Sequence, residues 1–289
     1  MNLLVEIIKF LIFSLGIVVV AKYLLVPVLR KLSELLGLGP KATGNIAGIA
    51  TSVPELLTVS FSAYAGFIAT GIYNVISSNV INLIQYLFAI YLNKNQKYIS
   101  NKAIKIDIII VIITIILPIV LSAINVELGL GSVVIFMLLL SLFYYINFNV
   151  HKLYLKEQDK KILEEEQTVY KNDTNKSKYN KPIKIILNII YLILIGITLY
   201  VIGNLLSDCL TNLSIIFNLP ELLLGIALGV ITSIPELVTF IESQRKEKKS
   251  NGNAELGVVE ATNNLLTSNL LNLFVIQSIG IIIYNIFVV

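Results

Sequence analysis

The sequence has few charged residues for its length. Only 14% of its 289 residues are charged and 56% are hydrophobic, whereas a soluble domain has about 25% charged residues. This composition excludes a water-soluble globular enzyme and a disordered chain. The charges are grouped in short stretches between long runs of Leu, Ile and Val, which indicates a multi-pass integral membrane protein, expected in the cell membrane.

Cysteine and histidine are almost absent. The single cysteine, Cys209, excludes an intramolecular disulfide framework and a zinc site made of thiolates. The single histidine, His151, lies in a charged segment, so no histidine-based catalytic dyad is available within the membrane. The net charge of +4 could suggest a nucleic-acid partner, but the positions of the basic residues explain it better as membrane topology. We therefore expect neither an enzyme nor a nucleic-acid-binding protein.

The hydrophobic runs predict an all-α transmembrane bundle of about eight spans. A hydrocarbon core about 30 Å thick needs about 20 apolar residues per helix, and long Leu/Ile runs without paired turn signals favour helices over a barrel. The first span is too long for a cleavable signal and is expected to remain. The predicted spans are Leu3–Leu25, Ala42–Ala65, Thr70–Leu92, Ile106–Ile124, Leu128–Phe148, Ile183–Leu205, Pro220–Ile241 and Thr262–Phe287.

The connections between spans alternate in charge. Those after spans one, three, five and seven contain Lys or Arg, whereas Gly66–Ala69, Asn125–Glu127 and Ser207–Leu219 contain none. The positive-inside rule places the basic connections in the cytoplasm and both termini outside. We expect these basic residues to set the topology, with binding of anionic lipid headgroups as a minor alternative.

The chain is expected to divide into two unequal transmembrane halves. Residues 1–150 would form a first repeat of five spans, and residues 183–289 a second repeat of three. Residues 151–182 between them are too polar to bury. We expect this segment to begin as a helical extension of span five and to continue as a flexible cytoplasmic linker.

Two sequence motifs occur once in each half. TSVPELLTV starts at Thr51 and TSIPELVTF at Thr232, with six of nine positions identical. NVISSNVINL starts at Asn74 and NLLTSNLLNL at Asn264, with five of ten identical. Spans two and seven begin on opposite sides of the membrane, so the motifs form inverted repeats, an architecture found in many secondary transporters.

Glu55 and Glu236 are the carboxylates predicted to lie deep in the membrane, at equivalent positions of the repeats. An ionised carboxylate there costs about 2.5–3.5 kcal/mol on insertion scales, so a partner is expected. Outside span one no Lys or Arg is predicted at that depth, which leaves a proton or a metal cation. Two glutamates would match one divalent or two monovalent cations. The acidic residues expected nearer span ends, within reach of water, are Glu6, Asp107, Glu221, Glu242 and Glu260.

The residues around the glutamates supply further oxygen atoms. Thr51 and Ser52 share a helical face with Glu55. Pro54 has no N–H and so frees the carbonyl of Ala50 as a ligand. Pro235 does the same for Ile231, and two polar stripes consist of Asn74, Ser78 and Asn82 and of Asn264, Ser268 and Asn272. Such an all-oxygen set favours a hard cation such as Ca²⁺.

These motifs resemble the α-repeats of the cation/calcium antiporter superfamily, whose best-known branch is the sodium/calcium exchangers. The family pattern is G-T-S-[LIV]-P-E on the second helix and G-N-x-x-G-S-N-x-x-[DN] on the third. The resemblance covers roughly spans two, three, seven and eight. The matching residues are Thr51, Ser52, Pro54, Glu55, Asn74, Ser78, Asn79 and Asn82, and Thr232, Ser233, Pro235, Glu236, Asn264, Ser268, Asn269 and Asn272.

The resemblance implies a secondary active cation antiporter that exchanges Ca²⁺ for Na⁺ by alternating access, without a cofactor, as spans one and six move against the motif helices. It assigns Ca²⁺ to Glu55, Glu236, Thr51 and Thr232, the Na⁺ positions also to Ser52, Ser78, Ser233 and Ser268, and the central position to Asn82 and Asn272. Two alternatives stay open. One is a calcium/proton exchanger on the same scaffold, because burial favours protonated carboxyl groups; the other is a non-transporting ion-binding membrane protein.

The sequence departs from the family pattern at several glycines. Ala50 and Ile231 replace the glycine before T-S, Tyr73 and Asn263 the glycine that opens each stripe, and Ser77 and Thr267 the glycine before S-N. These larger residues are expected to loosen helix packing or to change the preferred ion size. Asn272 stands where some members have Asp. Family members have five helices per repeat, so a homo-oligomer is one way to replace the two that this second half lacks.

Overall fold

The computed structural model describes residues 2–36, 38, 40–123, 129–154, 181–250 and 254–289, and no strand occurs in these ranges. Each predicted span overlaps one helix or one run of consecutive helices. The elements are α1 (Leu3–Val20), η1 (Ala21–Leu25), α2 (Val26–Leu36), α3 (Pro40–Thr51), α4 (Val53–Tyr64), α5 (Ile68–Leu92), η2 (Gln96–Ser100), α6 (Lys102–Ala123), α7 (Leu130–Tyr154), α9 (Lys181–Thr211), η4 (Asn212–Ile216), α10 (Glu221–Thr232), α11 (Ile234–Ser250), α12 (Ala254–Leu270), η5 (Leu271–Ile276) and α13 (Gln277–Phe287).

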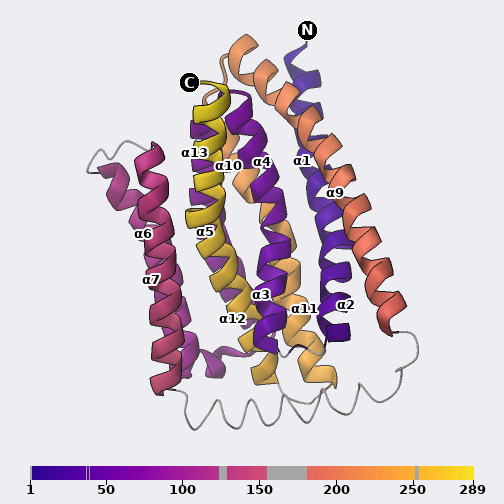
Figure 1. The fold of residues 1–289 in the computed structure, drawn as a ribbon, viewed down its shortest axis with the longest axis vertical. Coiled ribbons are helices and arrows are strands. Elements are labelled where there is room, and N and C mark those ends of the chain that lie inside the picture. The colour runs from indigo at the N-terminus through magenta and orange to yellow at the C-terminus, as the bar shows by residue number, and fades with distance from the viewer. Residues whose placement is uncertain (1, 37, 39, 124–128, 155–180, 251–253) are drawn as a thin grey trace.

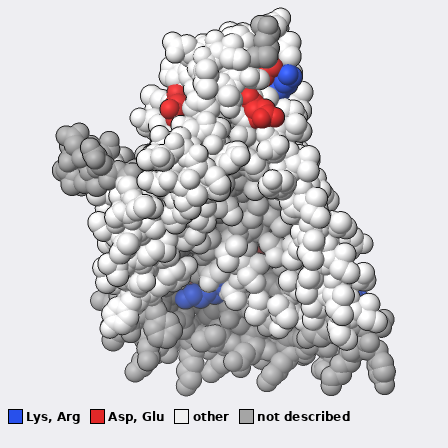
Figure 2. Space-filling model, turned by 45° about the horizontal axis from the view of Figure 1, so that its top comes forward, with Lys and Arg blue, Asp and Glu red and all other residues white. Residues whose placement is uncertain are grey.

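Within the described residues, seven helical segments are long and apolar enough to cross a membrane, and Leu130–Ile146 is a shorter apolar helix. The chain is therefore a multi-pass integral membrane protein with an all-α fold, as predicted. On the face shown in Figure 2, charged side chains lie toward the two ends of the molecule, and the middle is almost free of them. This distribution is expected for a surface that faces lipid.

Several helices extend beyond the predicted spans, and two of these differences change a predicted connection or start. The connection predicted at Ser207–Leu219 is mostly helical, because α9 continues to Thr211 and η4 to Ile216. The last span was expected to begin at Thr262, but α12 begins at Ala254. Both errors have one cause: a helix can extend beyond its hydrophobic stretch when its polar end is covered by protein or reaches water.

The two motif-bearing halves run in opposite directions (Figure 1). The chain passes from α3 into α4 toward the end of the bundle where both termini lie, and from α10 into α11 away from it. The inverted repeat is thus confirmed. The orientation in the membrane stays a prediction, and the turn at Asn125–Glu127 and residues 155–180 of the expected linker lie outside the described residues.

Two apolar clusters flank a polar centre. One joins α1, α9 and α10 through residues such as Ile17, Leu206 and Leu228. The other joins α5, α6, α7, α12 and the segments next to them, and includes Phe136 and Phe274. Figure 1 shows the helices of the motifs between these two groups. Hydrophobic burial on both sides therefore holds the polar motif residues in the middle of the bundle.

Each motif helix is interrupted at the serine of its T-S-x-P-E sequence. Helix α3 ends at Thr51 and α4 begins at Val53, and α10 ends at Thr232 and α11 begins at Ile234. Because Pro54 has no N–H, it cannot continue the hydrogen-bond ladder of α3. The predicted broken helices are confirmed, and each places its glutamate in the first turn of the second segment.

Close helix packing at Gly48 and Gly229 accommodates the residues that replace the family glycines. A Cβ atom at Gly229 would lie 2.9 Å from the carbonyl oxygen of Asn74 and would also meet Ser77. A Cβ atom at Gly48 would lie 2.8 Å from the Cβ atom of Thr267. At these two positions the packing is close rather than loosened, because glycines on the facing helices leave room for the larger side chains. An effect on the preferred ion size stays a prediction.

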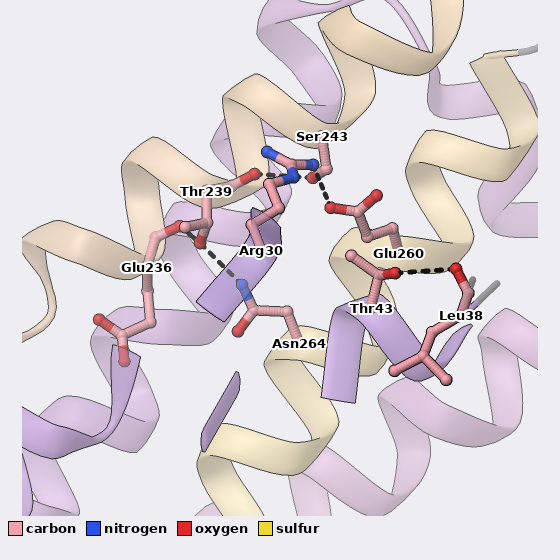
Figure 3. A network of polar contacts seen from close by, with 8 residues as sticks. All are labelled: Arg30, Leu38, Thr43, Glu236, Thr239, Ser243, Glu260 and Asn264. Atoms are coloured by element: carbon pink, nitrogen blue, oxygen red, sulfur yellow. Dashed lines mark hydrogen bonds and ion pairs between the residues drawn. The ribbon is translucent and has the colours of Figure 1, made fainter. Parts of the chain in front are cut away.

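Three of the acidic residues expected to reach water are buried instead: Glu6, Asp107 and Glu260 are each at most 4% exposed. Glu6 accepts hydrogen bonds from Lys9 Nζ at 2.8 Å and Asn212 Nδ2 at 3.1 Å. Glu260 on α12 forms an ion pair with Arg30 on α2, as Figure 3 shows. Neighbouring segments supply Asn212 to Glu6 and Arg30 to Glu260, which a plot of single spans cannot show.

We predict that Gly229→Ala destabilises the bundle by about 1–3 kcal/mol, because the added methyl group overlaps the backbone of α5. Thermal unfolding of the detergent-solubilised protein measures this. Gly196→Ala is the matched control, since a Cβ atom at Gly196 meets nothing within 4 Å. Equal melting temperatures for the two variants would contradict the packing described here.

Candidate cation-binding site

The ten residues predicted to bind cations are all buried in the structure. They come from α3, α4 and α5 in the first repeat and from α10, α11, α12 and η5 in the second. Each is at most 3% exposed: Thr51, Ser52, Glu55, Ser78, Asn82, Thr232, Ser233, Glu236, Ser268 and Asn272. The fold therefore keeps the whole predicted set inside the protein and away from lipid.

Glu55 and Glu236 lie close enough for their charges to interact. The hydroxyl groups of Thr232 and Ser78 are next to the carboxyl group of Glu55, but neither makes a hydrogen bond to it. On the other side, Ser268 Oγ donates to Glu236 Oε1 at 3.2 Å. Each glutamate is thus surrounded by hydroxyl groups, and Glu55 has a neighbour from the opposite repeat.

Direct hydrogen bonds join the two repeats at this level. Ser52 Oγ donates to Ser268 Oγ at 2.9 Å, and Asn82 Nδ2 donates to the same oxygen at 3.3 Å. Ser78 and Thr232 have their hydroxyl oxygens 3.5 Å apart. The residues of the two motifs consequently form one site at the repeat interface rather than two separate sites.

Asn79 and Asn269 hold the two stripe helices together at the centre. Asn79 Nδ2 donates to the carbonyl oxygen of Asn269, and Asn269 Nδ2 donates to the carbonyl oxygen of Asn79, both at 3.2 Å. Their side-chain oxygens accept from Asn272 at 3.1 Å and from Asn82 at 3.3 Å. These reciprocal contacts follow the two-fold relation of the repeats and leave the amide oxygens of Asn82 and Asn272 free of donors.

Several buried oxygen atoms of the site have no hydrogen-bond donor among the described residues. They are Glu55 Oε1 and Oε2, Glu236 Oε2, Asn82 Oδ1, Asn272 Oδ1 and Ser233 Oγ. Buried polar atoms are hydrogen-bonded in most proteins, so each exception requires an explanation. A concentration of unpaired acceptors around two carboxyl groups is the chemistry of a hard-cation site.

No basic side chain among the described residues forms a salt bridge with either glutamate. Figure 3 shows the carboxyl group of Glu236 pointing away from Arg30, whose guanidinium group pairs with Glu260. The positive charge that the two glutamates require is therefore not supplied by the ion pairs found in the structure.

The second stripe differs from the first in backbone conformation. Asn82 lies within the regular helix α5, whereas Asn272 lies within the π-helical segment η5. π-Helical turns are rare and occur mainly at functional sites. The two repeats are therefore related in sequence but differ in backbone geometry at the centre. The spacing of hydrophobic residues in the sequence does not reveal this π-helical turn.

Thr58 and Thr239 belong to the site's surroundings but were not among the predicted site residues. Thr58 Oγ1 accepts from Asn74 Nδ2 at 2.5 Å, and Thr239 Oγ1 accepts from Asn264 Nδ2 at 2.7 Å. The sequence did contain a signal for them, because both occupy the eighth position of the repeated nine-residue motif.

Two comparisons with known proteins give a match to this chain. A family model described as "Sodium/calcium exchanger protein" matches residues 7–153 and 187–289. No curated protein matches the chain. Among solved structures, the sodium-calcium exchanger NCX_Mj, soaked with 10 mM Na⁺ and zero Ca²⁺, matches with a TM-score of 0.49 and 19% sequence identity, over 98% of this chain and 84% of that chain.

The family model covers both motif-bearing halves of the chain, and the assignment rests on it. It also agrees with the resemblance that the repeated T-S-x-P-E and N-x-x-x-S-N sequences indicated. The chain belongs to the sodium/calcium exchanger protein family, a family of membrane cation exchangers.

Proposed function

We propose that this protein exchanges Na⁺ for Ca²⁺ across the membrane by alternating access at one central site. The observation that carries the proposal is the pair Glu55 and Glu236, one from each inverted repeat, which are both buried and of whose four carboxyl oxygens three have no donor. Inverted repeats that meet at a central polar site are typical of secondary transporters.

The charge of the site favours one Ca²⁺ or two Na⁺. Two ionised carboxylates contribute a charge of −2, and burial without a counterion costs several kcal/mol for each ion. A divalent cation between them, or two monovalent cations, would offset that cost. Ca²⁺ binds six to eight oxygens, and the site offers carboxylate, hydroxyl and amide oxygens close to one another.

We assign Ca²⁺ to the two glutamates with Thr51 and Thr232, since these hydroxyl groups lie beside the carboxyl groups of the opposite repeat. The serines of both motifs would complete the Na⁺ positions, and the amide oxygens of Asn82 and Asn272 would line the centre. The carbonyl groups of Ala50 and Ile231 are further ligands of the broken helices.

Coupling follows from the cost of the empty site. Because Ca²⁺ and Na⁺ compete for the same carboxylates, the site holds one kind of ion at a time. If the protein reoriented with an empty site, two uncompensated negative charges would be closed off from water on both sides. This is unfavourable in a low-dielectric interior. Reorientation therefore occurs with ions bound, and net movement of Ca²⁺ requires an opposite movement of Na⁺.

Proton-coupled exchange is the second candidate, because two buried carboxyl groups can bind protons instead of metal ions. The unpaired oxygens of Asn82 and Asn272 favour Na⁺ over H⁺. A proton needs one basic oxygen, whereas a dehydrated metal ion needs several neutral ligands around it as well.

We predict that Glu55→Gln and Glu236→Gln each abolish Ca²⁺ uptake into proteoliposomes that contain Na⁺. Each substitution removes one of the two buried charges while it keeps the size of the side chain. Glu242→Gln is the matched control on the same helix as Glu236, since Glu242 is exposed. Wild-type uptake by both site variants would show that the site assignment is wrong.

The choice between sodium and proton coupling is tested with gradients. We predict rapid Ca²⁺ uptake with an outward Na⁺ gradient and none with a pH gradient alone. Uptake driven by the pH gradient without Na⁺ would favour calcium/proton exchange. Ca²⁺ binding by the purified protein without flux under either gradient would indicate a non-transporting ion-binding protein.

A further inference from the structure

Two hydrogen-bonded chains, related by the inverted repeat, connect each glutamate to a threonine of the opposite repeat. In the first, Thr58 Oγ1 donates to the carbonyl oxygen of Glu55 at 3.1 Å and accepts from Asn74 Nδ2. Asn74 Oδ1 in turn accepts from Thr232 Oγ1 at 3.4 Å. All of these side chains are completely buried, so water does not compete for the contacts.

The second chain repeats the first with equivalent residues. Thr239 Oγ1 donates to the carbonyl oxygen of Glu236 at 2.9 Å and accepts from Asn264 Nδ2, as Figure 3 shows. Asn264 Oδ1 accepts from Thr51 Oγ1 at 3.3 Å. Thr51 Oγ1 also lies 3.3 Å from the carbonyl oxygen of Gly48, so its proton has two acceptors.

The chains fix the direction of each asparagine amide. Thr58 donates its only hydroxyl proton to the backbone carbonyl oxygen of Glu55. Toward Asn74, the hydroxyl oxygen of Thr58 can therefore act only as an acceptor. The NH₂ group of Asn74 must therefore face Thr58, and the amide oxygen must face Thr232.

A hydroxyl group can bind a cation only through its lone pairs, so its proton has to point elsewhere. Asn74 Oδ1 accepts from Thr232 and also from Ser78 at 3.3 Å, the two hydroxyl groups next to Glu55. Ser268 provides the contrast, because it has no such acceptor and donates to Glu236 instead. A hydroxyl whose proton is not taken by an amide thus becomes a donor to the carboxylate.

We propose that Asn74 and Asn264 are positioning residues that turn the hydroxyl protons of Thr232 and Thr51 away from the carboxylates, so that the hydroxyl oxygens are ready to bind Ca²⁺. This inference rests on the proposed function. Thr58 and Thr239 act one step further out, since they set the orientation of the amides. Without Asn74, Thr232 donates to Glu55, stabilises the empty site and weakens ion binding. Thr51 keeps the carbonyl oxygen of Gly48 as a second acceptor, so the loss of Asn264 has a smaller effect.

The test is a set of double-mutant cycles on Ca²⁺ affinity, measured by titration calorimetry on the purified full chain. The variants are Asn74→Leu, Asn264→Leu, Thr232→Val and Thr51→Val, alone and in all four asparagine–threonine pairs. We expect Asn74→Leu to weaken Ca²⁺ binding about fivefold or more, the effect of one lost hydrogen bond. When Asn74→Leu is combined with Thr232→Val, the loss of Ca²⁺ affinity should be about fivefold smaller than the product of the two single losses.

The crossed pattern separates positioning from a general effect. Asn74 should couple to Thr232 and Asn264 to Thr51, while the pairs Asn74 with Thr51 and Asn264 with Thr232 are additive. A coupling carried by the bound ion itself would appear equally in all four pairs and would overturn the proposal. A purely structural role would lower the fraction of protein that binds and leave the affinity of that fraction unchanged, which would also overturn it.

Thr58 provides a second set of variants should Asn74→Leu fail to fold. Thr58→Ser keeps the hydroxyl group and should bind Ca²⁺ like the wild type. Thr58→Val keeps the shape, releases the amide of Asn74 and should weaken binding in the wild-type background, but it should cause no further loss in a protein that already carries Thr232→Val. Equal affinity for Thr58→Val and the wild type would overturn the inference alone, whereas a wild-type protein that binds no Ca²⁺ would overturn the proposed function.

Discussion

Two acidic side chains, one from each inverted repeat, are buried within range of electrostatic interaction and without a basic partner among the ion pairs that the structure contains. The other features of the centre depend on this unfavourable arrangement. An ionised pair in a low-dielectric interior repels itself and loses its hydration. Hydroxyl and amide oxygens lie around the pair and bring no further charge. In the function proposed above, a hard cation offsets the cost of this arrangement.

The inverted repeat makes this arrangement possible with one short motif used twice. Each T-S-x-P-E sequence breaks its helix and presents a glutamate, and each stripe of the opposite repeat contacts that break. Gly48 and Gly229 allow the backbones to approach closely enough for these contacts. The reciprocal hydrogen bonds between Asn79 and Asn269 hold the two stripe helices at the same level.

Much of the fold and the site could be predicted from the sequence, because the responsible signals are local. The membrane spans could be predicted from the length of the hydrophobic runs. The inverted repeat could be predicted from the side of the membrane on which each motif begins. Glu55 and Glu236 stood out because acidic residues are rare deep in a membrane span. What could not be predicted depends on contacts between distant segments. The partners of Glu6 and Glu260, the π-helical turn at Asn272 and the fit of Thr267 against Gly48 are examples. Thr58 was present in the repeated motif, but only its hydrogen bond to Asn74 shows what it contributes.

Exchange by this mechanism requires that one Ca²⁺ lies between the two glutamates. A structure determined from protein equilibrated with Ca²⁺ would show whether it does. We expect a single ion between Glu55 and Glu236, about 2.3–2.6 Å from carboxylate oxygens of both, as is usual for Ca²⁺. An ion bound elsewhere, or a Ca²⁺-saturated structure in which one of the two carboxyl groups turns toward lipid, would contradict it.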